Sequence, residues 1–177
     1  MRTLTDQLST YAAYHRDRRN IITHFIGIPM IVLAVTILLS RPAFDVGLPV
    51  PLTPAIVLFV LTSLFYLRLE FALGLTMVVQ TALYTWAGHW FGEQSTAVWL
   101  VSGIGLFVLG WVIQFIGHFY EGRKPAFVDD IVGLLVGPMF VVGEWLFAVG
   151  WGHEMLAEIE RRVGPTHLRD LAASATR

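Results

Sequence analysis

The chain has 177 residues, of which 55% are hydrophobic and only 14% are charged, whereas an average soluble domain carries about 25% charged residues. This composition predicts an integral membrane protein. The formal net charge of −1 argues against a nucleic-acid partner, and the absence of cysteine excludes disulfides, thiolate nucleophiles and thiolate-ligated metals. Any bound metal must therefore be held by histidine, carboxylate or amide oxygen.

The first 117 residues contain one polar and four apolar segments. Residues 1–23 have no apolar core directly after a basic start, so they are not expected to be a signal peptide. Their apolar residues recur at roughly helical spacing, which predicts an amphipathic helix at the membrane surface. Four transmembrane helices are expected at about residues 24–40, 55–67, 71–91 and 97–117. Residues 41–54 contain four of the eight prolines and predict an irregular connection.

The last apolar segment, residues 126–151, differs from the others because it contains Asp129, Asp130 and Glu144 and has Gly137-Pro138 in its middle. Each half would be roughly 15–20 Å long as a helix, which is too short to cross a hydrocarbon core of about 30 Å. This segment is predicted either to be broken or re-entrant at Gly137-Pro138 or to form a kinked fifth span.

The expected fold is therefore all-α: four to five transmembrane helices form a compact antiparallel bundle. A single membrane domain covers residues 1–177 and ends in a polar tail at residues 152–177. Nothing in the sequence indicates an oligomeric state.

The distribution of basic residues predicts the orientation, because lysine and arginine are enriched in cytoplasmic loops. Arginines at positions 2, 16, 18 and 19 place the N-terminus in the cytoplasm, and the alternation of spans places Arg123 and Lys124 on the same side. We expect a bacterial protein of this kind in the inner membrane and a eukaryotic one in the endoplasmic reticulum.

This topology sorts the six histidines. His15, His24 and His118 fall at the cytoplasmic interface and can meet, whereas His89 falls at the opposite interface. His153 is cytoplasmic only if the last apolar segment returns, and His167 lies in the polar tail, where a solvated role is expected. Three histidines from separate elements, with carboxylates nearby, suit a divalent transition metal.

One geometric objection concerns His15 and His24, which are nine residues apart. One straight helix would place them on opposite faces, about 13.5 Å apart. Either the chain bends between them, with Asn20 or residues 16–19 at the break, or the two side chains bind different things. Asparagine at such a break is reasonable because it is a good helix cap.

The stretch QFIGHFYEGRKPAF places Gln114, His118 and Glu121 on one face at the end of the fourth predicted span. An imidazole beside a carboxylate at a membrane boundary indicates a metal site or an acid/base pair. The alternative is that His118 anchors the helix at the interface and Glu121 is a solvated charge.

Two motifs carry a family resemblance. YAAYHRDRRNIITHFIGIP and GWVIQFIGHFYEGRKPAFVDDIVGLLVGPMFVVGE, about a third of the chain, resemble the DUF962 or Mpo1-like family of small multi-pass membrane proteins, and residues 41–95 resemble it only in hydrophobicity. The resemblance implies an Fe(II)-dependent dioxygenase of fatty acid α-oxidation. Such an enzyme converts a 2-hydroxy long-chain fatty acid and O2 to the one-carbon-shorter acid and CO2. The implied iron ligands and catalytic residues are His15, His24 and His118.

Other polar residues take roles within that hypothesis. Glu121 is expected either to be a further ligand or, preferably, to bond the free ring nitrogen of a ligand histidine and fix its orientation. Asn20 and Gln114 would orient ligands or iron-bound water, with a helix cap and a packing amide as their alternatives. Arg123 and Lys124 would attract the substrate carboxylate, although topology explains them equally well. Asp129, like Asp130 and Glu144, is expected to accept structural hydrogen bonds or to hydrogen-bond the residues that bind the metal.

The implied reaction fits what the sequence lacks. Oxidation of a 2-hydroxy acid to the shorter acid and CO2 releases four electrons, which is the number that O2 takes up. No 2-oxoglutarate, flavin or nicotinamide is then needed, and the chain has no Gly-rich dinucleotide fingerprint. The lipid substrate would enter sideways from the bilayer.

Two other functions stay open. Membrane di-iron hydroxylases and desaturases use eight or more clustered histidines, whereas this chain has six dispersed ones. A non-catalytic membrane protein that binds lipid or acts as a scaffold would have no reason to retain iron.

Overall fold

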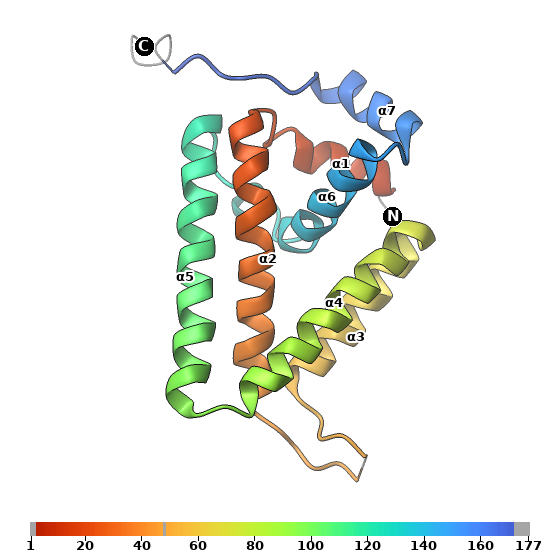
Figure 1. Cartoon of the computed structure of the whole chain (residues 1–177). Coiled ribbons are helices and arrows are strands. Elements are labelled where there is room, and N and C mark those ends of the chain that lie inside the picture. Colours follow the sequence, from red (N-terminus) through yellow and green to blue (C-terminus); the bar gives the residue numbers. More distant parts are fainter. Residues whose placement is uncertain (1–2, 48, 172–177) are drawn as a thin grey trace. The chain divides into compact units, whose positions relative to one another are not determined.

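The computed structural model describes residues 3–47 and 49–171, and these residues form helices joined by turns (Figure 1). The elements in chain order are α1 Leu4–Ala12, α2 Arg18–Ser40, α3 Pro54–Leu69, α4 Phe71–Gly92, α5 Thr96–Glu121, the short 3-10 helix η1 Ala126–Val128, α6 Gly133–Ala148 and α7 His153–Val163. Within the described residues, β-structure is limited to two isolated bridges. The prediction of an all-α protein is confirmed for this part of the chain.

The chain divides into two compact units. The first unit combines Met1–Ile28 with Val112–Arg177 and so contains α1, α6, α7, the start of α2 and the end of α5. The second unit, Pro29–Trp111, contains α3, α4 and the remaining parts of α2 and α5. All residues of the candidate site lie in the first unit.

Two of the described helices, α2 with 23 residues and α5 with 26, are long and apolar enough to cross a membrane. A third span is possible if α6 and α7, which are bent by 118° at the break between them, are taken together. The apolar helix α3 has only 16 residues. These helices agree with a membrane protein, whereas the count of four to five transmembrane helices and their orientation stay predictions.

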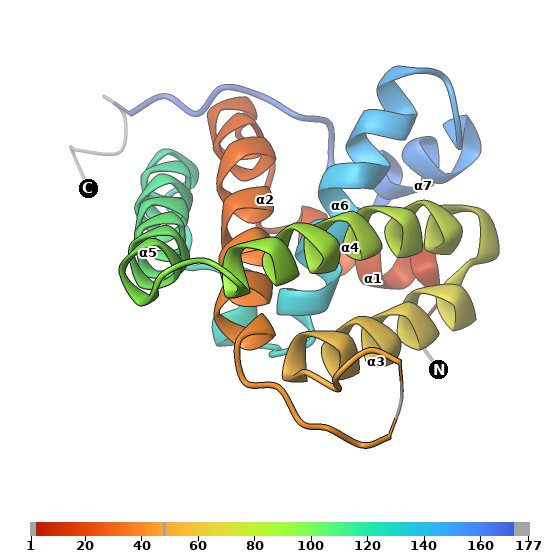
Figure 2. The same cartoon turned by 60° about the horizontal axis from the view of Figure 1, so that its bottom comes forward.

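The helices α3 and α4 form a hairpin with Glu70 as its only connecting residue (Figure 2). Glu70 ends α3 and also caps α4, because its carboxylate accepts hydrogen bonds from the amides of Ala72 and Leu73 at 3.0 and 2.6 Å. Gly74 allows the close approach of the two helices, since a Cβ there would lie 2.6 Å from the carbonyl oxygen of Tyr66.

The N-terminal region differs from the predicted helix over residues 1–23. The helix α1 ends at Ala12, and α2 begins at Arg18 instead of near His24. Asp17 supplies the helix cap, because its Oδ1 accepts the amide of Arg19 at 2.9 Å. The break therefore lies at residues 13–17, and Asn20 belongs to the first turn of α2.

The predicted position of the second break, Gly137-Pro138, is wrong. The helix α6 continues through Pro138, and the preceding Gly137 has no Cβ to clash with the proline ring. The chain turns instead at Gly150 and Gly152, whose φ angles of +96° and +69° favour glycine. This segment therefore bends where Gly150 and Gly152 adopt positive φ, and not at Pro138.

An ion pair joins α7 to α1. Arg162 donates from Nη1 to Oδ1 of Asp6 at 2.8 Å. Hydrogen bonds from Arg162, and then from Thr3, lower the pKa of Asp6 from 3.8 to about 2.

We expect this pair to give a pH-dependent stability. A carboxylate whose pKa is lower in the folded protein stabilises it fully above the unfolded value, and this contribution disappears as the pH falls from about 4 to about 2. The melting temperature of Asp6→Asn should therefore lie below that of the wild type at pH 7 and meet it near pH 2. A difference in melting temperature that does not change with pH would contradict this assignment. Thermal unfolding in detergent measures it.

Candidate metal centre

Three histidines converge in the first unit. His15 lies in the turn between α1 and α2, His24 lies in the second turn of α2, and His118 lies in the last turn of α5. One ring nitrogen from each lies within 4.8 Å of the others, and the three side chains are buried. The turn at residues 13–17 removes the geometric objection, because it lets His15 fold back onto the helix that carries His24.

The hydrogen bonds of two of these rings determine their tautomers. The Nδ1 atoms of His15 and His24 lie 2.7 and 2.8 Å from the backbone oxygens of Tyr11 and Asn20, respectively. A carbonyl only accepts, so each Nδ1 carries the hydrogen and each Nε2 of a neutral ring has a free lone pair. The two Nε2 atoms face each other at 3.0 Å. Two lone pairs at this distance repel each other, and a shared proton or a metal cation would remove the repulsion.

The environment of His15 disfavours the proton. Burial lowers the pKa of His15 well below its ordinary value of 6.5, and repulsion from His24 lowers it further, although the bond to Tyr11 acts in the opposite direction. A neutral imidazole with a bare Nε2 is the form that binds a metal. The donor set of this cluster therefore fits a metal cation.

Aromatic packing holds the ring of His15 in place. Tyr11 stacks on it with ring centroids 4.1 Å apart and the planes 7° from parallel, and Phe140 lies 5.6 Å away. Gly137 of α6 makes room for Tyr11, because a Cβ there would lie 2.8 Å from the phenol oxygen. The buried face of α6 thus supports His15 through Tyr11.

Glu121 holds the turn that carries His15. Its carboxylate accepts hydrogen bonds from the amides of Arg16 and Asp17 at 3.0 and 2.8 Å and from Nδ2 of Asn20 at 3.0 Å. The ring nitrogens of His15 and His24 are bonded to backbone carbonyls and not to Glu121. Helical spacing placed Glu121 near His118 but gave no sign that its partners are the backbone amides of another segment.

Two buried amide atoms near the histidines have no hydrogen-bond partner among the described residues. They are Oδ1 of Asn20 and Nε2 of Gln114. Asn20 and Gln114 are 0% and 4% exposed, respectively. Because an unpaired buried polar group costs about 1–3 kcal/mol, such a set indicates a bound ligand or ordered water.

Comparison with known proteins identifies the family. A family model described as "2-hydroxy-palmitic acid dioxygenase Mpo1-like" matches residues 1–149. This chain belongs to the Mpo1-like family. It is also 32% identical over 159 residues to the 2-hydroxy-palmitic acid dioxygenase MPO1 of Saccharomyces cerevisiae, a match that covers 89% of this chain and 87% of the yeast protein. No solved structure gave a significant match. The resemblance inferred from the two motifs is confirmed.

The remaining predicted residues of this Mpo1-like chain pair with other groups. Arg123 donates from Nη1 to the oxygen of Ala13 at 2.6 Å. Lys124 pairs with Asp129 at 2.5 Å, and Asp129 also accepts the hydroxyl of Tyr14 at 2.7 Å. Hydrogen bonds from Lys124 and Tyr14 lower the pKa of Asp129. None of these residues belongs to the group of described side chains with metal-site geometry, and their roles towards substrate or ligands stay predictions.

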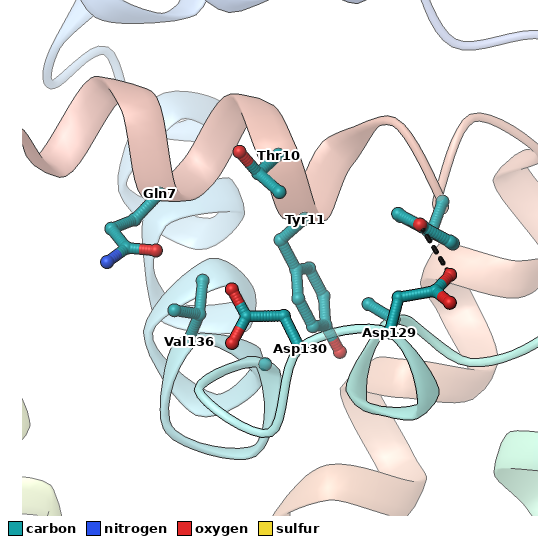
Figure 3. A pocket seen from close by; sticks show the side chains of 9 residues that line it. Gln7, Thr10, Tyr11, Asp129, Asp130 and Val136 are labelled. Carbon is teal, nitrogen blue, oxygen red and sulfur yellow. Dashed lines mark hydrogen bonds between the residues drawn. The ribbon is translucent and has the colours of Figure 1, made fainter. Parts of the chain in front are cut away.

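A cavity of about 220 Å³ in this Mpo1-like protein is lined by residues 7–14 and 126–136 (Figure 3). Tyr11 points from α1 towards the loop that carries Asp129 and Asp130, and all three residues line the cavity. Tyr11 thus both lines the cavity and stacks on His15. The carboxylates make this lining unsuited to another carboxylate.

The other histidines of this Mpo1-like chain lie outside the cluster of His15, His24 and His118. His89 belongs to α4 in the second unit and lies 3.4 Å from Glu93. His153 begins α7, and the side chain of His167 is exposed, as expected for a solvated residue. Among the described residues, only His15, His24 and His118 form a group with metal-site geometry.

Proposed function

We propose that this chain is an Fe(II)-dependent dioxygenase that converts a 2-hydroxy fatty acid and O2 to the one-carbon-shorter fatty acid, CO2 and water. The observation that carries the proposal is the pair of facing Nε2 atoms of His15 and His24, 3.0 Å apart, with His118 beside them. The match to 2-hydroxy-palmitic acid dioxygenases supports the class of substrate.

The residues fit a transition metal. Imidazole suits iron, and ligand nitrogens lie about 2 Å from such an ion, so two neighbouring ligands are roughly 3 to 3.5 Å apart. The separation of 3.0 Å between the two Nε2 atoms agrees with this requirement. A bound Fe(II) would supply a template for the substrate and a conduit for electrons.

The overall reaction balances without another cofactor. In R–CH(OH)–COOH + O2 → R–COOH + CO2 + H2O, the bond between C1 and C2 breaks. C2 is oxidised from an alcohol to a carboxylic acid, and C1 leaves as CO2. The substrate loses four electrons and O2 gains four. Of the five oxygen atoms of the reactants, one leaves as water.

The protein's own groups prepare the site. The backbone oxygens of Tyr11 and Asn20 keep Nδ1 of the two ligand rings protonated and their Nε2 atoms bare. Burial of the three imidazoles excludes bulk water from the reacting centre. These features favour a neutral ligand set before any substrate binds.

The unpaired amides are suited to the polar end of the substrate. Nε2 of Gln114 can donate a hydrogen bond to the carboxylate, and Oδ1 of Asn20 can accept one from the 2-hydroxyl group. The alkyl chain would lie along apolar surface such as that of α5, where Ile116, Phe115 and Phe119 are exposed. A lipid substrate would then enter from the bilayer.

We expect Gln114→Leu to raise the KM for 2-hydroxypalmitate by roughly 10- to 100-fold, because loss of one hydrogen bond to a charged group costs about 1.5–3 kcal/mol. Its iron content should stay that of the wild type, since Gln114 is not a ligand. Steady-state kinetics and metal analysis test both parts. An unchanged KM would exclude Gln114 from substrate binding. Gln80→Leu, in α4 of the second unit, is a matched control.

Product analysis tests the proposed reaction. Protein purified anaerobically and loaded with Fe(II) is given O2 and 2-hydroxypalmitate that carries ¹³C at C1. We expect pentadecanoic acid without the label and one equivalent of ¹³CO2. Bound iron without either product would contradict the proposed substrate class, and a protein that retains neither iron nor activity would favour a non-catalytic lipid-binding protein.

A further inference from the structure

The segment Gly164–Arg169, here called the strap, follows α7 and lies beyond residues 1–149, which match the family model. It pairs with the turn that carries His15 (Figure 1). The amide of His167 donates to the oxygen of Arg16 at 2.9 Å, and the amide of Arg18 donates to the oxygen of His167 at 3.0 Å. Together these two bonds form a parallel bridge between His167 and Asp17.

Further bonds attach both ends of the strap to the same turn. The amide of Arg169 donates to Oδ2 of Asp17 at 2.9 Å, and Arg19 donates to the oxygen of Arg169 at 2.8 Å. At the other end, Nη1 of Arg16 donates to the oxygen of Gly164 at 2.9 Å. Asp17 and Arg16 are 0% and 6% exposed, so these bonds lie in a buried part of the unit.

The strap also reaches the end of the helix that carries His118. A Cβ at Gly122 would lie 1.8 Å from Nη1 of Arg169, so the guanidinium packs directly on this glycine. Gly122 follows Glu121, whose carboxylate binds the same turn as the strap. Two segments that are distant from each other in the sequence, the end of α5 and the strap, therefore both bind residues 16–18.

We propose that the strap positions His15 for metal binding, with His167 and Arg169 as positioning residues. This inference rests on the metal centre of the proposed function. The strap fixes the backbone of Arg16 immediately after the ligand, and a ligand nitrogen must be held within about 0.5 Å of its productive place. Release of the strap frees the turn and weakens the site, although no strap residue touches the metal.

The test compares two substitutions at one position. His167→Pro removes the amide that donates to Arg16, whereas His167→Ala removes only an exposed side chain and keeps both backbone bonds. Metal-free full-length protein is titrated with Co²⁺ and followed by visible absorption. We expect about 10- to 100-fold weaker Co²⁺ binding and a changed ligand-field spectrum in His167→Pro, the range found when groups that orient ligands are lost. His167→Ala should match the wild type.

Arg169→Ala is a second variant that leaves the backbone bonds in place and removes the guanidinium from Gly122. We expect it to weaken Co²⁺ binding several-fold while the far-UV circular dichroism spectrum stays unchanged. Wild-type Co²⁺ affinity and a wild-type ligand-field spectrum in both His167→Pro and Arg169→Ala would overturn the proposal. Absence of Co²⁺ binding by the wild type itself would instead overturn the proposed metal centre.

Discussion

Replacing His24 with alanine should remove bound iron and lower the turnover of 2-hydroxypalmitate by more than about 100-fold, since loss of a group that merely orients a ligand already costs 10- to 100-fold. The substitution deletes one of the two facing Nε2 atoms and leaves His15 without its partner at 3.0 Å. Metal analysis after anaerobic reconstitution and product quantification by mass spectrometry measure the two effects.

His89→Ala provides the matched control, because His89 belongs to α4 in the second unit and lies beside Glu93. We expect wild-type iron content and turnover in this variant. Equal loss of activity in both variants would show that the assay responds to the removal of any histidine. Full iron content in His24→Ala would exclude this residue as a ligand.

Glu121→Gln should lower metal affinity by about 10- to 100-fold and reduce stability by roughly 1.5–3 kcal/mol. The carboxylate accepts the amides of Arg16 and Asp17 and the side chain of Asn20. A glutamine keeps one acceptor oxygen but presents an NH2 group to these donors, so the turn beside His15 loses part of its support. Co²⁺ titration and chemical unfolding measure the two quantities.

Glu93→Gln is the control for the loss of a glutamate, because the side chain of Glu93 is 65% exposed. It should leave the metal affinity and the stability within about 0.5 kcal/mol of the wild type, as for surface substitutions in general. If Glu121→Gln lowers stability but not metal affinity, then Glu121 supports the fold without positioning His15.

The convergence of the three histidines could be inferred from the sequence because the predicted transmembrane helices place all three at the same membrane interface. His15, His24 and His118 were expected to meet, and the structure brings their ring nitrogens within 4.8 Å. A break between His15 and His24 was one of two alternatives, because one straight helix would have separated them, and the structure has this break at residues 13–17.

The groups that hold the three histidines could not be inferred in the same way. The partners of Glu121 are backbone amides about 100 residues away in sequence, and backbone amides occur at every position and so leave no pattern. The strap uses the amide and the carbonyl of His167, so the identity of that side chain carries no signal of it.

The wrong position of the break at Gly137-Pro138 has a different cause. Proline removes one helical hydrogen bond, but α6 continues through Pro138, as α2 continues through Pro29. Gly150 and Gly152 adopt positive φ, and a glycine in a sequence does not reveal whether it uses that freedom. The acidic residues and the Gly137-Pro138 pair therefore predicted a broken segment but not the position of the break.

X-ray absorption at the iron K edge of anaerobically reconstituted protein tests the central claim most directly, namely that His15, His24 and His118 together hold one Fe(II). We expect about one iron per chain with the scattering of three imidazoles, and one imidazole fewer, or no bound iron, in His118→Ala. A wild-type protein that binds no iron, or iron without imidazole ligands, would contradict the proposed centre.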